Sequence, residues 1–237
     1  MIRWRLLYRV SWELAFASHL DRWRAISRSA RRAALPLVYS QGFHQRPRLA
    51  MGPPLPVGAC GEEELADLYL EDDSPRQRNT VHGAMFRVPG QEDFGPETKD
   101  FGLNLCDALN TSACPGLEVR RAWSLPLEER SLTACTYRAR WRMEGWWETV
   151  PPSEVVKALL AAPSLPLHRI TPKGEKDLDL RPYLLALQTG MESIEVELLV
   201  TPSGGVRWEE ICTLFQQRGY QFRLRGLCRT SLKWFSD

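Results

Sequence analysis

Apolar and polar residues alternate strictly at the start of the chain. Residues 2–10 place five apolar side chains on one face, namely Ile2, Trp4, Leu6, Tyr8 and Val10. This period of two predicts a strand that is buried on one side. Apolar residues then recur at helical spacing from His19 to Leu35. Ser18 is a suitable N-cap for that helix, and Asp21 stands three residues on, as in a capping box.

Two strands, a helix and a further strand follow in the first half. A short strand is predicted at residues 49–55, where its prolines confine it to a sheet edge. Residues 64–71 alternate again and predict a third strand. Residues 72–97 are polar and rich in Pro and Gly, so we expect an exposed insertion there. A helix over residues 98–109 and a strand over 116–125 complete the order β-α-β-β-α-β.

The second half of the chain repeats this order of elements. Its strands are predicted at residues 130–143, 167–170, 194–200 and 220–227. Its helices are predicted at residues 153–162 and 208–218. An internal duplication of this kind predicts an α+β fold made of two tandem ferredoxin-like (βαββαβ) units with antiparallel sheets. We expect the first unit at residues 1–127 and the second at residues 128–237.

Length and composition narrow the class of protein. A chain of 237 residues with 43% hydrophobic residues is large enough for one or two packed cores. No apolar run approaches the roughly 18–20 residues that cross a bilayer, and the first residues alternate with Arg. We therefore expect a cytoplasmic protein with no membrane contact. The six cysteines lie far apart, so neither a metal site nor a cofactor is predicted.

Charge is strongly segregated along the chain. Residues 1–50 contain ten arginines and two acidic residues, a net charge of +8, whereas residues 51–130 carry −8 and residues 131–237 carry +2. A basic segment of this density suits the neutralisation of phosphates. The alternative is that these arginines pair with the acidic middle segment of the same chain.

Three predicted strands carry alternating arginines. These are Arg3, Arg5 and Arg9, then Arg138, Arg140 and Arg142, and finally Arg223 and Arg225. In a ferredoxin-like unit the third strand lies beside the first, and these third strands carry Asp67 and Glu71 in one unit and Glu195 and Glu197 in the other. Opposite charges across neighbouring strands stabilise a sheet. The pattern therefore favours compensated ladders over a phosphate-binding sheet.

The first helix and the loop after it contain the main candidate site. Arg24, Arg28, Arg31 and Arg32 fall on the helical arc opposite the apolar residues, and guanidinium groups suit phosphate and stack on bases. In the loop, Tyr39 and Phe43 are candidates for base stacking, with Ser40, Gln41 and His44 for polar contacts and Arg46 and Arg48 for phosphates. The alternative is that the two aromatic residues only cover the edge of the core.

A few further polar residues are weaker candidates. His19 and His44 are a possible general acid–base pair, because histidine titrates near neutral pH, but a cap and a loop histidine more often only donate hydrogen bonds. Lys173 and Arg181 lie in a second polar motif and are candidate RNA contacts. Arg181 forms either an internal ion pair with Asp179 or a ligand clamp.

Several strings of this sequence resemble the radical-SAM-linked family of bacterial proteins, a domain of unknown function. They are residues 18–21 (SHLD), 39–43 (YSQGF), 47–48 (PR) and 54–58 (PLPVG), with Lys173, Lys176, residues 179–182 (DLRP) and 229–230 (RT) further on. Members typically stand beside, or are fused to, a B12-binding-type radical SAM protein. They usually have Asn where His44 stands and His where Arg46 stands, which weakens a role for His44.

These observations predict an RNA-binding accessory protein. The resemblance implies that it presents ribosomal or transfer RNA to a partner radical SAM enzyme, and no preference for DNA is expected. A second hypothesis is a metal-independent endoribonuclease that uses His19 or His44, in analogy to the duplicated fold of CRISPR repeat-processing proteins. A third is a protein–protein adaptor whose basic face docks an acidic partner.

Overall fold

The computed structural model describes residues 1–71, 96–171 and 174–235. Within these ranges the fold is mixed α+β, with five α-helices and mainly antiparallel strand pairing. The chain divides into two compact units. The first contains residues 1–57 and 63–133, and the second contains residues 58–62 and 134–237.

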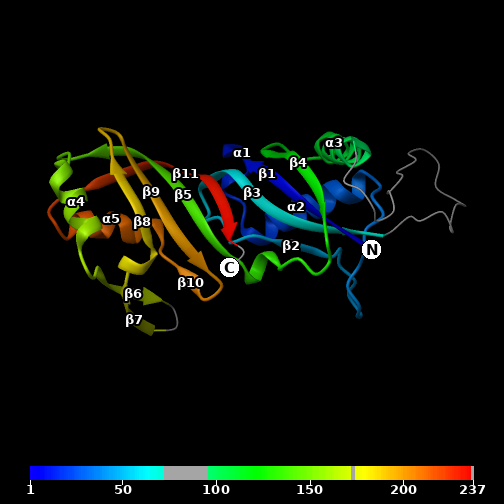
Figure 1. Cartoon of the computed structure of the whole chain (residues 1–237). Helices are drawn as coiled ribbons and strands as arrows, with labels where there is room; N and C mark the ends of the chain where they lie inside the picture. Colours follow the sequence, from blue (N-terminus) through cyan, green and yellow to red (C-terminus); the bar gives the residue numbers. More distant parts are fainter. Residues whose placement is uncertain (72–95, 172–173, 236–237) are drawn as a thin grey trace, which may run out of the picture. The chain divides into compact units, whose positions relative to one another are not determined.

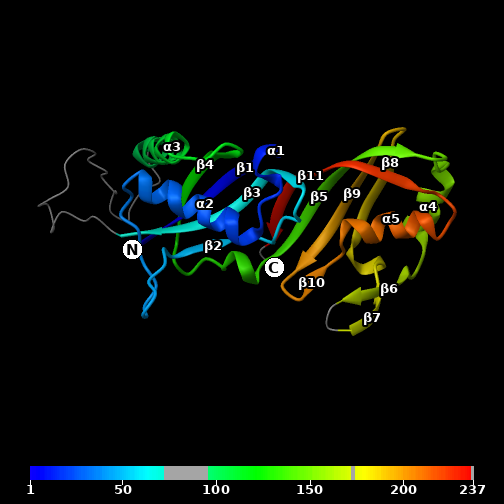
Figure 2. The same ribbon diagram turned by 180° about the vertical axis from the view of Figure 1, so that it is seen from behind.

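The first unit has four strands and three helices. In chain order they are β1 (Ile2–Val10), α1 (Trp12–Ala15), α2 (His19–Arg32), β2 (Leu49–Met51), β3 (Ala59–Leu70), α3 (Pro96–Thr111) and β4 (Leu117–Leu125). The strand order is β2-β3-β1-β4, and β1 is antiparallel to β4. A short 3-10 helix, Leu132–Ala134, follows β4. Helix α2 lies behind β1 and β3 in Figure 1 and in front of them in Figure 2, so it covers one face of these strands.

The second unit is built around a long central strand. Its elements are β5 (Thr136–Trp147), α4 (Ser153–Ala161), β6 (Pro166–Thr171), β7 (Gly174–Asp179), a 3-10 turn (Arg181–Tyr183), β8 (Leu184–Thr189), β9 (Ser193–Thr201), β10 (Gly204–Gly205), α5 (Trp208–Gln216) and β11 (Phe222–Phe235). Strand β5 pairs with β9 and β11, and β9 also pairs with β8 and β10. Strand β11 runs parallel to residues 59–61, the start of β3. Helix α5 covers one face of the β8 and β9 strands (Figures 1 and 2).

The order of elements is close to the predicted one, but the pairing of one predicted strand and the burial of another differ from the prediction. Residues 167–170 belong to β6, which pairs with β7 alone in a separate two-stranded sheet; the strand beside β9 is β8. Strand β1 is also not buried on one side only, because Arg3 and Arg5 on its other face are as buried as Trp4. Alternation marks which residues share a face, but it does not show whether the polar face is covered.

The remaining differences concern the ends of elements. Strand β2 is shorter than the predicted 49–55, β5 starts six residues after 130, and β11 continues well past residue 227. Most of the predicted polar insertion, residues 72–95, lies outside the described residues. Helix α1 was not anticipated: it spans a single turn that packs against the bend at Gly116, where a Cβ atom would meet Leu14 backbone at 2.7 Å.

Candidate nucleic-acid interface

Helix α2 begins at the predicted cap. The Ser18 hydroxyl accepts a hydrogen bond from the Asp21 amide at 3.1 Å, and it donates one to the Asp21 carboxylate at 2.7 Å. The carboxylate also accepts from Arg24 at 2.8 Å. The Ser18 hydroxyl, followed by Arg24, holds the pKa of Asp21 below its usual range. Arg24 is therefore ion-paired within its own helix, although about half of its side chain remains exposed.

Arg22 is a structural residue; the predicted arginine arc of this helix leaves it out, but its buried role was not predicted. Its guanidinium is 1% exposed and donates to the carbonyl oxygens of Ala15 and Leu55, both at 2.7 Å. It thereby ties the chain before α2 to the segment before β3. A signal was present in the sequence, because Arg22 lies four residues before buried Ile26 and so faces the same side of the helix.

Three arginines form an exposed row along the second half of α2. This helix arginine row consists of Arg28, Arg31 and Arg32, all of which are exposed. The guanidinium of Arg31 lies 5.9 Å from the centre of the Tyr39 ring. Within the described residues, Arg28 and Arg32 form neither an ion pair nor a side-chain hydrogen bond. Their charges face solvent, as the helical phase predicted.

The loop after α2 is a hairpin of residues 38–48, which we call the 38–48 hairpin. The Ser40 amide donates to the Arg46 carbonyl at 2.8 Å, the Arg46 amide donates to the Ser40 hydroxyl at 3.1 Å, and the Arg48 amide donates to the Val38 carbonyl at 2.7 Å. Ser40 thus supports the turn, a role beyond the polar ligand contact predicted for it. In Figures 1 and 2 this segment projects from the first unit as a narrow blue loop.

The base of the hairpin is attached to strand β3. The Val38 amide donates to the Tyr69 carbonyl at 3.0 Å, and the Tyr69 amide donates to the Arg48 carbonyl at 3.2 Å. The Arg48 guanidinium lies 4.3 Å from the centre of the Tyr69 ring, a cation–π distance. Arg48 therefore contributes to the anchor, and Tyr69 was not anticipated from the sequence because it lies more than twenty residues away.

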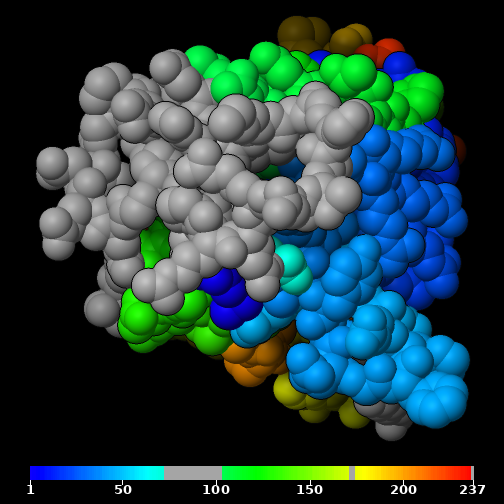
Figure 3. Space-filling view, turned by 90° about the vertical axis from the view of Figure 1, so that its right-hand side faces the viewer, coloured from blue at the N-terminus to red at the C-terminus, as the bar shows by residue number. Residues whose placement is uncertain are grey.

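The tip of the hairpin is exposed. Gln41, Phe43, His44 and Arg46 are all exposed, and Phe43 is fully so. Gly42 has a φ of 127°, and a Cβ there would meet no atom within 4 Å. A positive φ of this kind favours glycine. In the space-filling view of Figure 3 the hairpin stands out as a light-blue lobe.

The two candidate histidines occupy different elements. His19 is the first residue of α2. His44 lies at the hairpin tip, where its ring meets the Phe43 ring edge-on with 5.9 Å between the centres. A general acid–base pair would need both imidazoles within reach of one substrate atom.

The second polar motif falls in the residue range of the second unit. Lys173 lies outside the described residues. Arg181 belongs to the second unit, where its side chain donates to the Leu184 carbonyl at 2.7 Å and its amide donates to Asp179 at 2.9 Å. The amides of Leu165 and then Arg181 hold the pKa of Asp179 below its usual range. The guanidinium of Arg181 thus contacts a carbonyl of its own turn and its amide contacts Asp179, while the predicted ion pair and the predicted ligand clamp both stay predictions.

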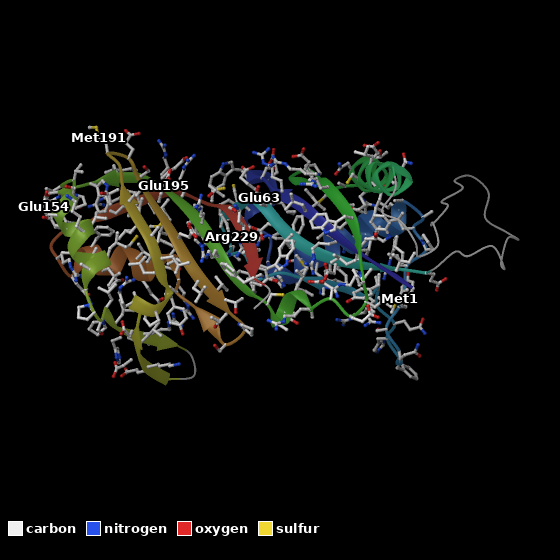
Figure 4. All side chains as sticks on the ribbon, viewed as in Figure 1. Met1, Glu63, Glu154, Met191, Glu195 and Arg229 are labelled. Carbon is white, nitrogen blue, oxygen red and sulfur yellow. The ribbon has the colours of Figure 1, made fainter. Side chains whose placement is uncertain are left out.

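A second row of arginines lies on β5, where the predicted ladder is confirmed. This strand arginine row consists of Arg138, Arg140 and Arg142. Arg140 donates to Glu197 at 2.8 Å and Arg142 donates to Glu195 at 3.1 Å, across the β5–β9 pairing. Arg138 lies over the Phe235 ring of β11. Figure 4 labels Glu195, which lies on β9.

The stretch of sequence that contains the 38–48 hairpin carries charge of one sign. Residues 22–61 contain seven arginines and no Asp or Glu. With Arg22 buried and Arg24 paired, the helix arginine row and Arg46 remain to attract an anion, beside the aromatic rings of Tyr39 and Phe43. Cationic side chains interleaved with exposed aromatic rings are typical of single-stranded nucleic-acid interfaces.

Two other candidate chemistries, metal binding and thiol chemistry, depend on His, Cys, Asp and Glu side chains of the described ranges. No group of three His, Cys, Asp or Glu side chains there is placed to hold a metal ion. The six cysteines are free, and burial raises the pKa of Cys212 to about 11. None of the helices in these ranges combines the length and hydropathy that a membrane crossing needs.

The fold is α+β, and the first unit exposes arginines and aromatic rings on α2 and the 38–48 hairpin. The chain belongs to a bacterial family described as "Uncharacterized protein conserved in bacteria (DUF2344)", whose model matches residues 3–85 and 103–207. A search of curated proteins found no match. The predicted membership of an uncharacterised bacterial family is thus confirmed, whereas the link to radical SAM proteins stays a prediction.

Proposed function

We propose that this protein binds RNA through the helix arginine row and the 38–48 hairpin, as an accessory that presents ribosomal or transfer RNA to a radical SAM enzyme. The observation that supports RNA binding most strongly is the exposed row of Arg28, Arg31 and Arg32. No carboxylate pairs with these side chains in the described part of the chain. Each guanidinium that neutralises a phosphate releases condensed counterions, which favours binding.

The aromatic residues beside this row favour RNA over a simple acidic protein. Tyr39 is partly exposed next to Arg31, and Phe43 is fully exposed at the hairpin tip. Flat rings stack on bases, and sequence-tolerant stacking beside a basic groove is how many proteins hold single-stranded nucleic acid. An adaptor for an acidic protein needs the positive charge but gains nothing specific from a ring at the tip.

The partner part of the proposal rests on the resemblance to the radical-SAM-linked family. The sequence has no clustered cysteines of the kind that hold an iron–sulfur cluster. We therefore assign the modification chemistry to the partner and RNA presentation to this chain, both in the cytoplasm. The strand orders β2-β3-β1-β4 and β8-β9-β5-β11, each within a β-α-β-β-α-β plan, support two ferredoxin-like units, with β6 and β7 inserted in the second.

Crosslinking in native cells tests this function. The tagged chain is irradiated with ultraviolet light and purified under denaturing conditions, and its RNA is sequenced. We expect ribosomal or transfer RNA fragments with the wild type. We expect a loss of most of that signal when Arg28, Arg31 and Arg32 are each replaced by Gln. The matched control replaces Arg138, Arg140 and Arg142 by Gln, which removes the same charge from the other row.

Purifications from the same cells distinguish RNA presentation from the adaptor and nuclease hypotheses. RNA recovery at background, or equal recovery with both triple variants, would rule the proposal out. A native purification treated with ribonuclease identifies retained proteins by mass spectrometry. A radical SAM enzyme that is lost on ribonuclease treatment supports presentation of RNA. A different partner that is retained supports the adaptor hypothesis instead. Cleavage of bound RNA that disappears in both His19→Ala and His44→Ala would support the nuclease hypothesis.

A further inference from the structure

We infer that the 38–48 hairpin is a binding site for an unpaired nucleotide, so that the RNA substrate is a duplex interrupted by a bulge or a short internal loop. This inference rests on the proposed RNA binding and adds the class of RNA that the site selects. The helix arginine row holds the backbone of such an RNA, and the hairpin tip takes the unpaired base.

The first argument is that Phe43 is displayed on a supported stem. Hydrogen bonds between Ser40 and Arg46 cross the hairpin just below the tip, and the Val38, Arg48 and Tyr69 backbones join its base to β3. Buried Pro47 faces Tyr39 in the bridge between the two arms. A base that stacks on Phe43 therefore meets a residue whose supporting backbone is already folded, which lowers the entropy lost on binding.

The second argument is that Phe43 makes no contribution to the core. The side chain is fully exposed, and its ring contact within the described residues is with His44 beside it at the tip. Single exposed apolar residues are common on protein surfaces. Phe43 differs because it stands at the end of a supported hairpin, next to a glycine in a left-handed conformation and within 40 residues that contain no acidic side chain.

The third argument concerns which RNA a ring at such a tip reaches. Bases of an A-form duplex are stacked inside the helix, and its major groove is too deep and narrow for side chains to read. Away from the ends of a duplex, an aromatic ring gains a stacking partner only from a base that has left the stack. Gln41, His44 and Gln45 flank Phe43 and carry donors and acceptors for the edges of such a base.

The composition of the tip disfavours a protein pocket or a lipid surface as the occupant. Between Tyr39 and Pro47, Phe43 is the one large apolar residue, and the others are Ser, Gln, Gly, His and Arg. Membrane-bound segments present a wide apolar face, and anchors of protein interfaces sit within a desolvated cluster. One ring among polar groups, with Arg46 beside it, fits one base and one phosphate.

The test compares two RNAs that differ by one nucleotide. Fluorescence anisotropy measures the affinity of the full-length protein for a blunt RNA duplex and for the same duplex with a single bulged uridine. We expect the wild type to bind the bulged RNA roughly tenfold more tightly, in line with the stacking of one base on an aromatic ring. Phe43→Ala should remove this difference, and Phe43→Trp should restore it.

Phe16→Ala is the matched control. Phe16 is another largely exposed phenylalanine of the first unit, and it lies outside the hairpin. Its replacement should leave the preference for the bulge intact. With 5-iodouridine at the bulge, ultraviolet light should crosslink the RNA to the tryptic peptide 33–48, which contains Phe43.

The outcomes separate this inference from the proposed function. No binding to either RNA defeats both. Equal binding to the two RNAs, or a preference that Phe43→Ala leaves unchanged, defeats the unpaired-nucleotide site and leaves RNA binding standing. Phe43-dependent binding to vesicles of anionic phosphatidylglycerol, without a preference among RNAs, also overturns the site. A crosslink confined to peptides of the second unit contradicts it directly.

Discussion

The protein has two rows of three exposed arginines, one on α2 and one on β5, and their surroundings differ. On β5, Arg140 and Arg142 face Glu197 and Glu195 across the sheet, and Arg138 lies over Phe235. On α2, Arg31 lies over Tyr39 while Arg28 and Arg32 meet no carboxylate within the described residues. The comparison teaches that the number of arginines does not identify a binding surface. The neighbours that a strand or helix supplies decide whether their charge is available to a ligand.

The origin of the difference lies in the secondary structure. A strand places its partner strand about 4.8 Å away, so that each arginine of β5 faces one residue of β9. The outward face of a helix has no such neighbour. The strand row therefore receives partners through sheet pairing, whereas Arg31 of the helix row lies near Tyr39 of the 38–48 hairpin.

The first unit also contains buried arginines, and the largest effect that we expect on the free energy of unfolding comes from changing their carboxylate partner. Asp67 accepts hydrogen bonds from Arg3 at 2.9 Å and from Arg5 at 2.7 Å, and all three side chains are almost fully buried. Asp67→Asn removes the charge of the buried carboxylate that both guanidinium groups contact. We expect the free energy of unfolding to fall by about 3–5 kcal/mol, as for other broken buried pairs. Urea denaturation followed by circular dichroism measures it.

The control for that change lies in the strand row. Glu197→Gln removes the carboxylate partner of Arg140, whose side chain is mostly exposed. Water screens such a pair, so the loss should stay below about 1 kcal/mol. A loss of similar size for both variants would show that burial does not distinguish the two kinds of arginine.

Removing the carboxylate partners of the strand arginine row should make its arginines available to RNA, as those of the helix arginine row are. The double variant Glu195→Gln, Glu197→Gln leaves Arg140 and Arg142 without partners, while sheet pairing stays in place. We expect the affinity for a blunt RNA duplex to rise about two- to fivefold at low salt, because two exposed cations become available for phosphates. Filter binding measures the change.

The matched control for this gain removes two carboxylates elsewhere in the same unit. Glu154 and Glu209 are exposed on α4 and α5 and accept no side-chain bond from arginine among the described contacts. Replacing both by Gln changes the net charge equally. If this control raises the affinity as much as the strand variant does, net charge rather than arginine pairing controls binding.

The smallest effect that we expect is a pH-dependent change in stability that comes from His168, in the β6–β7 pair of the second unit. His168 on β6 lies 2.9 Å from Asp177 and 3.3 Å from Glu175. Its hydrogen bond to Asp177 raises the pKa of His168 above its usual value, against a smaller opposing effect of desolvation. The stabilisation is therefore complete below the unfolded pKa of about 6.5 and is lost as the pH rises through the higher folded pKa.

Thermal unfolding at two pH values checks this. The melting temperature of the wild type should exceed that of His168→Gln by a small margin at about pH 5.5, and the margin should disappear at about pH 9. Asp177→Asn should reduce the margin as well, since it removes the main partner. A margin that grows with pH would reverse the sign that the ion pair requires. His44, on the other hairpin, packs against Phe43 instead.

Periodicity predicted the local elements well and their long-range partners less well. The cap at Ser18, the outward phase of Arg28, Arg31 and Arg32, and the β5–β9 ladder follow from residues close in sequence or from one strand pairing. By contrast, the burial of Arg3 depends on carbonyl groups of Glu129 and Arg130, more than 120 residues away. No local pattern encodes such a contact.

The candidate site shows the same limit. Its composition was readable from the sequence, and the helical phase separated Arg22 from the helix arginine row, but no local pattern showed that Ser40 and Arg48 support the hairpin. Strand β8 was missed because its short apolar pattern follows the polar strands β6 and β7. The stretch at residues 167–170 was assigned the position beside β9 that β8 occupies. Lys173 lies outside the described residues, so its predicted RNA contact stays a prediction.

The most direct test of the central claim is the salt dependence of RNA affinity for the two triple variants. Filter binding to one RNA at several salt concentrations gives the slope of log K against log salt, which scales at about 0.7–0.9 per neutralised phosphate. Replacing Arg28, Arg31 and Arg32 by Gln should reduce the magnitude of the slope by about 2–3. Replacing Arg138, Arg140 and Arg142 by Gln should leave it nearly unchanged. Equal slopes for the two variants, or a larger loss from the strand row, would contradict the account.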